Sequence, residues 1–161
     1  MSPFTAISSD AIMINREDVH QLLASFSRHG FELEELHWPS VEHYFQAMKF
    51  AGTGLQDKIR QAGHPRDAQH LAKRNFWRVR RDWKKVQRVV MTRGTYIKCR
   101  THPEVAEALL ATGDKMLVEN STYDHFWGCG RDGRGNNYYG KMLMDVRDRL
   151  NKELASATHT D

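Results

Sequence analysis

The residues best suited to chemistry lie in one short stretch, Ser40–Ala51, where a carboxylate, an amide and an amine are separated by helical spacing. At about 100° per residue, Glu42, Gln46 and Lys49 fall within about 60° of one another on a helix. Apolar side chains occupy nearly all of the remaining circumference, so we expect the helix to be buried and its polar stripe to face a pocket or a polar network. Buried carboxylates and amines have shifted pKa values, which acid–base and nucleophilic catalysis exploit.

A plainer interpretation of the same stripe is that it forms the one solvated face of the helix. Glu42 would then only complement the helix dipole from the first turn. The pattern alone leaves both interpretations open.

A second segment, Glu119–Gly140, combines carboxylates, aromatic rings, glycines and paired asparagines. Glu119 and Asp124, beside Phe126 and Trp127, are suited to recognising a planar base and the hydroxyls of its ribose. A segment this rich in glycine, aspartate and asparagine is also typical of a simple connection between elements. Both interpretations stay open on the pattern alone.

The glycines of this segment satisfy G-x-G-x-x-G at Gly128, Gly130 and Gly133. No βαβ pattern surrounds them, so the sequence does not indicate a dinucleotide-binding crevice. The glycines instead let a loop bend closely around a ligand, or merely turn.

The formal net charge is +4, and the basic residues crowd into one stretch. Such a cluster can bind phosphates or a nucleic-acid backbone, although a solvated helix face has the same composition. With no nucleic-acid-binding motif around it, we interpret the stretch as attraction for a phosphorylated ligand. Its members are Arg74, Arg78, Arg80, Arg81, Lys84, Lys85 and Arg88.

Composition bounds the class of protein. With 40% hydrophobic and 27% charged residues, the 161-residue chain is expected to form a single domain over 1–161. No apolar run approaches the ~20 residues that cross a bilayer, which predicts no membrane association. Cys99 and Cys129 form no CxxC pair, which favours a reducing cytoplasm. The histidines have no zinc-binding spacing, so we expect neither a metal nor another cofactor, and His43 and His64 are expected to be structural or solvent-facing.

Hydrophobic periodicity predicts a mainly α, multihelical fold with minor β strands near the N-terminus and around residue 117. We expect a strand at Ala11–Asn15, a helix at Asp18–Ser27 and strand-like alternation from Phe31 to Trp38. Ser40 then caps the polar helix described above, and glycines end it after Ala51.

The second half of the chain is predicted to be helical apart from a strand at Met116–Val118 and a loop at Gly128–Gly135. The last helix has one apolar stripe, and the polar tail Ala155–Asp161 is expected to fray. The further helices are expected at Leu55–Ala62, Pro65–Lys73, Asp82–Cys99 and Pro103–Gly113. The stripe of the last helix comprises Tyr139, Met142, Leu143, Val146 and Leu150.

Five motifs in a fixed order are specific enough to indicate a family. They are WPSVEHYFQAMKF at Trp38–Phe50, Arg81-x-Trp83, LLATGDKMLVE at Leu110–Glu119, Asp124-x-x-Trp127-Gly128-x-Gly130, and Asn137-x-x-Gly140-x-x-Leu143-Met144-x-x-Arg147. This series closely resembles the NADAR family, including its YbiA-like riboflavin-intermediate N-glycosidases, over about residues 38–150.

The resemblance implies a chiefly helical fold and a hydrolase that cleaves a C1′–N bond in a phosphorylated riboside. Some family members cleave early ribosylamino-pyrimidine phosphate intermediates of riboflavin synthesis. Others resemble erasers of ADP-ribose attached to guanine, an activity that would give the basic stretch an ADP-ribosylated nucleic acid as partner. A third hypothesis is a module that binds NAD or ADP-ribose without chemistry.

The resemblance also implies the site. Glu42, Lys49 and Asp124 are the predicted catalytic residues. A carboxylate would stabilise an oxocarbenium-like ribosyl centre and activate water. Lys49 would bind phosphate, protonate the leaving group or form a Schiff base with ring-opened ribose. The residues predicted to bind substrate are Trp38, Gln46, Trp83, Glu119, Trp127, Gly128 and Asn137.

The sequence departs from the family upstream of Trp38. Phe26-Ser27-Arg28-His29 stands where members usually have a Phe-Ser-Asn-Phe-like element, and the hairpin that follows is abbreviated. That element can shape the ligand pocket, so the identity of the substrate stays open. Tyr139 replaces the usual leucine, which we expect to be a change in packing.

Overall fold

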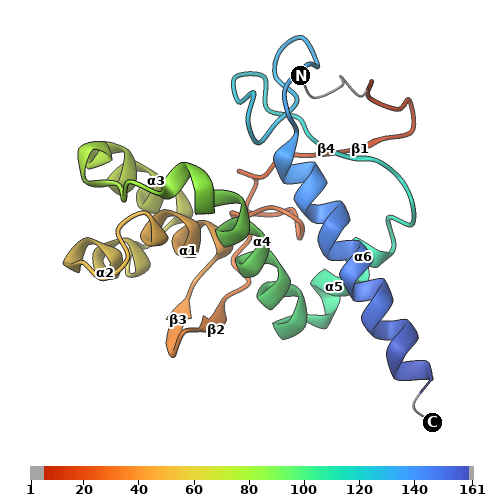
Figure 1. The fold of residues 1–161 in the computed structure, drawn as a ribbon, viewed down its shortest axis with the longest axis horizontal. Coiled ribbons are helices and arrows are strands. Elements are labelled where there is room, and N and C mark those ends of the chain that lie inside the picture. Colours follow the sequence, from red (N-terminus) through yellow and green to blue (C-terminus); the bar gives the residue numbers. More distant parts are fainter. Residues whose placement is uncertain (1–5, 160–161) are drawn as a thin grey trace.

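The fold, given by a computed structural model that describes residues 6–159, is mostly helical with a few short strands, as predicted. Figure 1 shows α1, α2 and α3 gathered at one end of the molecule and α5 and α6 at the other, with α4 running between the two groups. The helices are α1 (Val41–Met48), α2 (Gly54–Arg60), α3 (Pro65–Arg74), the 3₁₀ turn η1 (Phe76–Arg78), α4 (Trp83–Thr101), α5 (Pro103–Leu110) and α6 (Tyr138–Thr158). None of the helices within residues 6–159 is long and apolar enough to cross a membrane.

The strands β1 (Ile12–Ile14) and β4 (Leu117–Glu119) form a parallel pair, with Ile12 opposite Leu117 and Ile14 opposite Glu119. Both strands therefore end at the same edge, and the segments that follow them leave side by side. The backbone N–H of Asn120 extends this contact by donating to the carbonyl of Ile14 at 2.9 Å. This edge of the pair brings residues about 100 positions apart in the chain together.

The strands β2 (Phe31–Leu33) and β3 (Leu36–Trp38) form an antiparallel hairpin. Its two turn residues, Glu34 and Glu35, have φ values of 57° and 65°. Two-residue hairpins favour such positive values, but the usual residues there are asparagine and glycine, so the sequence carries no clear signal for the turn. Arg93 of α4 donates to the Glu34 carboxylate at 2.7 Å and so ties the hairpin to the central helix.

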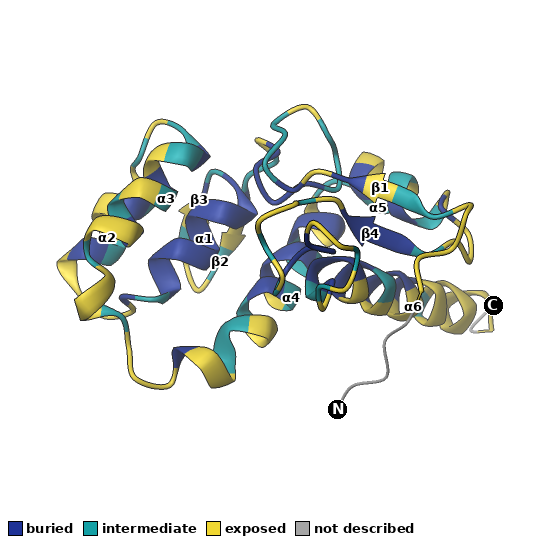
Figure 2. Ribbon diagram, turned by 90° about the horizontal axis from the view of Figure 1, so that it is seen from above, coloured by how far each residue is buried: buried dark blue, intermediate teal, exposed yellow. Residues whose placement is uncertain are grey.

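Helix α1 lies in the core, as its apolar circumference predicts. All eight of its residues are buried, and Figure 2 shows the whole helix in the buried class. Ser40 caps it as expected, since its Oγ accepts the backbone N–H of His43 at 3.1 Å. Helix α4 crosses α1 closely at Gly94, where a Cβ atom would lie only 3.0 Å from Tyr44 Cδ1. The polar stripe of α1 therefore has to be satisfied inside the protein.

The helix predicted at Asp18–Ser27 is wrong, because the segment forms consecutive turns. Its backbone carbonyls have tertiary partners instead of helical ones. Lys98 Nζ donates to the carbonyls of Leu22 at 2.7 Å and Ala24 at 2.8 Å, and the hydroxyl of Tyr139 donates to that of Leu23 at 2.6 Å. The apolar spacing that suggested a helix reflects turns packed against the core.

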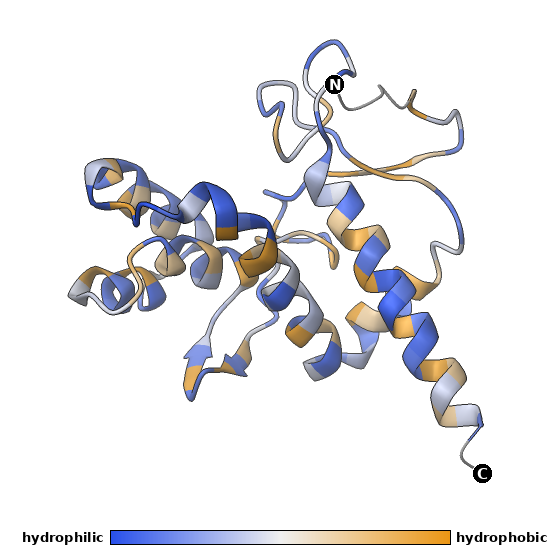
Figure 3. Ribbon diagram, viewed as in Figure 1, coloured by the Kyte–Doolittle hydropathy of each residue, from blue (hydrophilic) through white to orange (hydrophobic). Residues whose placement is uncertain are grey.

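The ends of several elements also differ from expectation. Helix α1 ends at Met48 and α5 at Leu110, each followed by turns. Helix α6 continues to Thr158, through most of the tail expected to fray from Ala155, and residues 160–161 lie outside the described residues. Good helix formers such as Leu154 and Ala155 favour the continuation of the helix. The apolar stripe of α6, visible as alternating bands in Figure 3, is buried as predicted.

Candidate active site

The candidate site forms where the edge of the β1–β4 pair meets helix α1, and Arg16 is at its centre. Arg16 Nη1 lies 2.9 Å from Glu42 Oε2, and Nη2 lies 3.9 Å from Asp124 Oδ2. One guanidinium thus links the two carboxylates predicted to be catalytic, which come from α1 and from the loop after β4. Sequence reasoning missed Arg16, whose only signal was its place directly after a predicted strand.

Glu42 is fully enclosed and receives hydrogen bonds on both carboxylate oxygens. Oε2 accepts from Arg16 and, at 2.7 Å, from Ser25 Oγ, while Oε1 accepts from Gln46 Nε2 at 2.8 Å and Gln69 Nε2 at 3.4 Å. Burial raises the pKa of Glu42, but the Arg16 charge and the donors outweigh burial, so the net pKa lies below its ordinary value. Glu42 is therefore a fixed negative charge.

Asp124 has a more open position. Its Oδ1 accepts the backbone N–H groups of Phe126 at 3.0 Å and Trp127 at 2.8 Å, which fixes the carboxylate at the start of a turn. Its Oδ2 faces Arg16, and the side chain is 29% exposed. The partly exposed carboxylate of Asp124 can contact a water molecule, whereas the fully buried carboxylate of Glu42 cannot.

Glu119 and Asn137 build the loop that carries Asp124. Glu119 is buried, and its carboxylate accepts the backbone N–H groups of Arg16 at 3.3 Å and Ser121 at 3.1 Å; burial raises its pKa. The side chain of Asn137 accepts from the backbone N–H of Glu119 at 2.8 Å and donates to the carbonyl of Leu117 at 2.9 Å. Both residues were predicted to bind substrate, and in the structure their polar atoms bond to the protein.

Gly128 has a related packing role, because a Cβ at this position would collide with Glu119 Oε2. A Cβ at Gly140, in the first turn of α6, would likewise collide with the carbonyl oxygen of Leu117. These glycines let the loop and the helix close against β4. The loop that carries Asp124 is held tightly to the strand edge as a result.

The rings of Trp83 and Trp127 both pack against the ring of Phe45 of α1, next to the site. The centre of the Phe45 ring lies 5.0 Å from that of Trp83 and 5.5 Å from that of Trp127. Lys49 Nζ lies 5.5 Å from the centre of the Phe45 ring and 5.8 Å from that of Trp83. Two of the three tryptophans named from the sequence, Trp83 and Trp127, thus form an aromatic wall with Phe45 next to the lysine.

Lys49 follows α1 as its C-cap and lines a pocket of about 510 Å³. Burial lowers the pKa of its ammonium group and nearby Arg16 lowers it further, while Glu42 opposes them only in part. Gln46 lines the same pocket, and its buried Oε1 accepts no hydrogen bond from any of residues 6–159. The other lining residues are Arg66, Gln69, His70, Ala72, Lys73, Phe76 and Val79.

Trp38 lies in the core, away from this site. It is fully buried, its Nε1 donates to the carbonyl of Leu33 at 3.0 Å, and its ring packs edge-on against Tyr44. The side chain therefore has no surface to offer the substrate that it was predicted to bind.

His43 and His64 stabilise helix ends. His43 Nε2 lies 2.9 Å from the carbonyl of Ala62, and His64 Nδ1 accepts the backbone N–H of Arg66 at the start of α3. Across residues 6–159, no group of three or more histidine, cysteine or acidic side chains is arranged to hold a metal ion.

Comparison with known proteins gives this geometry a family context. The model of the NADAR domain matches residues 8–151. The chain is 40% identical over 135 residues to an N-glycosidase of Nostoc punctiforme, covering 82% of this chain and 86% of that protein. It is 34% identical over 148 residues to the chloroplastic riboflavin biosynthesis protein PYRR of Zea mays, covering 83% of this chain but only 24% of that protein.

A solved structure supports the same relationship. The N-glycosidase YbiA of Escherichia coli K12 is 33% identical over 127 residues, which cover 79% of each protein. The NMR structure of E. coli YbiA superposes with a TM-score of 0.79 at 30% identity, covering 95% of both chains.

Proposed function

The chain belongs to the NADAR family and is an N-glycosidase by homology, and from this premise we propose that it hydrolyses the ribosyl C1′–N bond of a phosphorylated N-riboside. The substrate class that we favour is the early ribosylamino-pyrimidine phosphates of riboflavin biosynthesis. The similarity to the maize riboflavin biosynthesis protein supports this choice.

The observation that carries the proposal is the charge of the pocket beside Glu42. Lys49, Arg66 and Lys73 line it, and no carboxylate among residues 6–159 does. A pocket with several cations and no acid favours an anion such as a sugar phosphate. The unpartnered Gln46 Oε1 offers an acceptor for a ribose hydroxyl or a base N–H.

The two carboxylates then have different tasks. As the C1′–N bond breaks, its electron pair leaves with the nitrogen and positive charge develops on the ribosyl centre. The fixed charge of Glu42 stabilises that centre. Asp124 accepts a proton from the water whose oxygen forms the new bond to C1′. Arg16 holds both carboxylates in position through contacts of 2.9 and 3.9 Å.

Lys49 supplies the proton to the departing nitrogen in this scheme. Its lowered pKa suits the role, because a less basic ammonium group gives up its proton more readily. The same lowered pKa also allows a neutral amine to form a Schiff base with ring-opened ribose. Borohydride added during turnover distinguishes the two: a covalent adduct on Lys49 supports the Schiff base, and full activity with no adduct supports proton donation.

The direct test offers three compounds to the purified protein: a ribosylamino-pyrimidine phosphate, an oligonucleotide carrying ADP-ribosylated guanine, and NAD. Released base is measured by mass spectrometry, with Asp124→Asn as the control. Release from the pyrimidine riboside alone, abolished in the variant, supports the proposal. Tight binding of NAD with no release from any compound contradicts it and supports a binding module.

A second candidate function, removal of ADP-ribose from guanine in nucleic acid, is favoured by the surface around η1. Phe76 and Trp77 are 73% and 68% exposed, and their ring centres lie 5.6 Å apart within the predicted basic stretch. Exposed rings among cations are typical of surfaces on which single-stranded bases stack. Turnover of the oligonucleotide that falls in Trp77→Ala, with no turnover of the pyrimidine riboside, favours this candidate.

A further inference from the structure

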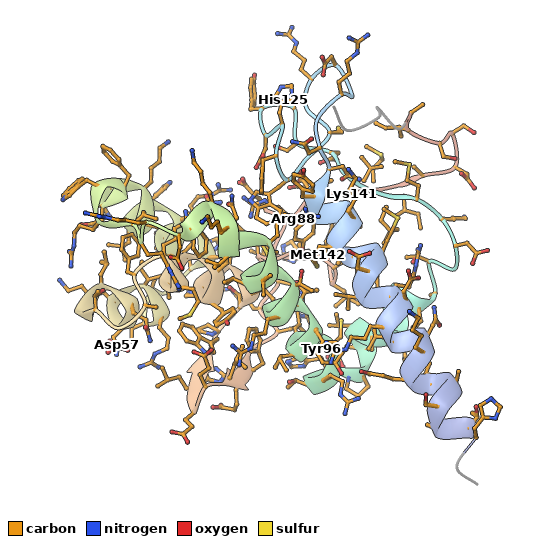
Figure 4. The ribbon with its side chains drawn as sticks, viewed as in Figure 1. Asp57, Arg88, Tyr96, His125, Lys141 and Met142 are labelled. Carbon is orange, nitrogen blue, oxygen red and sulfur yellow. The ribbon has the colours of Figure 1, made fainter. Side chains whose placement is uncertain are left out.

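A second cavity, of about 590 Å³, lies in the groove between α4 and α6. None of its lining residues lines the pocket of Lys49, so the two cavities are separate. Figure 4 shows Arg88 and Tyr96 from α4 and Met142 from α6 along this groove. The lining residues are Lys85, Arg88, Val89, Thr92, Arg93, Tyr96, Trp127, Tyr138, Met142, Asp145 and Arg149.

The charge of the groove favours an anion. Four cations line it and one carboxylate, Asp145, does. Two of the cations have acidic partners: Arg93 donates to Glu34 at 2.7 Å, and Arg149 to Glu153 at 3.3 Å. Lys85 and Arg88, both exposed, add positive charge beyond these pairs. An anionic ligand is thereby attracted over neutral or cationic ones.

Two arginine–tyrosine stacks are built into the walls of this groove. Arg88 Cζ lies 3.9 Å from the centre of the Tyr138 ring, and Arg149 Cζ lies 3.7 Å from that of Tyr96. Stacking fixes the plane of a guanidinium but leaves its N–H edge available. An edge held in this way matches the oxygens of a phosphate group.

The groove also offers an apolar surface to a flat ring. Val89 is 67% exposed in the groove, whereas Met142 and Trp127, which also line it, are only 4% and 5% exposed. Exposed apolar surface that is bordered by cations suits a ligand that is itself part ring and part anion. Trp127 also packs against Phe45, so the groove abuts the aromatic wall of the candidate active site.

We propose that the α4–α6 groove is a second ligand site that binds a mononucleotide, with its base against Val89, Met142 and Trp127 and its phosphate on Arg88. The cavity volume falls in the range of small-molecule sites, about 300–1,000 Å³. Apart from Trp127, which the groove shares with the aromatic wall, its lining residues take no part in the catalytic scheme.

The test uses AMP as a probe that joins a flat ring to one phosphate, with adenosine and ribose 5-phosphate as half-probes, titrated by calorimetry. We expect AMP to bind more tightly than either half-probe and less tightly as salt rises. Arg88→Gln and Val89→Glu, both at exposed helical positions, are each expected to weaken AMP binding about 10-fold, because the first loses a charge-assisted contact and the second places a carboxylate in the groove that repels the phosphate. Lys58→Gln on the remote helix α2 is the matched control and should bind AMP as the unmodified protein does.

Lys49→Met decides the location of the probe. AMP binding that survives Lys49→Met but weakens in Arg88→Gln and Val89→Glu supports the groove. Binding lost in Lys49→Met and unchanged in the two groove variants puts the probe in the pocket of Lys49 and overturns the proposal. A folded protein, verified by circular dichroism, that binds no AMP at millimolar concentration overturns it as well.

Discussion

The two carboxylates of the candidate site lie on opposite sides of one arginine and differ in almost every physical respect. Glu42, on a buried helix, has no exposed surface and receives hydrogen bonds on both oxygens. Asp124, in a loop after a strand, is 29% exposed and uses one oxygen to cap its own turn. The enclosed group keeps its charge, whereas the open one can exchange a proton with water. The site thus separates electrostatic stabilisation from proton transfer.

Exchanging each carboxylate for its amide tests this comparison most strongly. Asp124→Asn and Glu42→Gln are both expected to lower turnover by about 10²–10⁴, because each loses a group that acts in the transition state. Their stabilities should differ. The free energy of unfolding of Asp124→Asn should lie within about 1 kcal/mol of that of the unmodified protein, because the Asp124 side chain is partly solvated. Initial rates and urea unfolding measure both quantities.

Glu42→Gln is expected to lower the free energy of unfolding by about 3–5 kcal/mol, because it leaves Arg16 buried without its closest counter-charge. Glu107→Gln, at an exposed position on α5, is the matched control and should change neither turnover nor the free energy of unfolding. Equal unfolding free energies for Glu42→Gln and Asp124→Asn contradict the distinction drawn between the two carboxylates.

Removing the arginine separates stability from function. Arg16→Met is expected to lower the free energy of unfolding by about 3–5 kcal/mol, since Glu42 then stays buried without the cation that is hydrogen-bonded to it. The double variant Arg16→Met/Glu42→Leu replaces the pair with apolar groups and should recover much of that loss, while turnover stays at the level of the single variants. If the double variant is no more stable than Arg16→Met, the loss of stability in Arg16→Met does not come from the unpaired carboxylate of Glu42.

The sequence predicts the α1 half of the site much better than it predicts the arginine between the halves. Glu42, Gln46 and Lys49 share a helical face, and helical periodicity is local, so their alignment can be calculated from spacing alone. Arg16 reaches them only because β1 pairs with β4, about 100 residues further along the chain. Three-residue strands leave too little pattern to predict that pairing.

Tertiary contacts also explain the elements that were predicted wrongly. Asp18–Ser27 has the apolar spacing of a helix, but Lys98 and Tyr139 bond to its carbonyls and hold it as turns. These partners lie more than 70 residues away, and no local pattern contains them. The positive φ values of Glu34 and Glu35 are likewise invisible in the sequence, because turn statistics assign such values to other residue types.

The pH dependence of turnover sharpens the role of Lys49. Because burial lowers its pKa below the ordinary value of 10.5, a proton donor here should make kcat fall as pH rises through a value below 10.5. A nucleophilic amine gives the opposite sign, a rise over the same window. Lys49→Met should remove this limb and lower turnover about 10- to 100-fold. Lys73→Met, in the same pocket, should keep the limb and raise KM for a phosphorylated substrate. A profile unchanged in Lys49→Met excludes both roles.

The smallest effect on turnover is expected at Trp38, which packs against Tyr44 of α1, in contrast to Trp83, which packs against Phe45. Trp38→Phe removes the hydrogen bond to the carbonyl of Leu33 and leaves a void beside Tyr44, so the free energy of unfolding should fall by about 1–3 kcal/mol. Turnover of the folded variant should stay within about twofold of the unmodified protein, because the ring is fully buried in the core. Trp83→Phe is the matched control, since it changes a ring that lies 5.8 Å from Lys49 Nζ and should raise KM. A folded Trp38→Phe variant that lowers turnover as much as Trp83→Phe does contradicts this expectation. Trp38 would then affect the reaction through α1 and would have to be counted as part of the site.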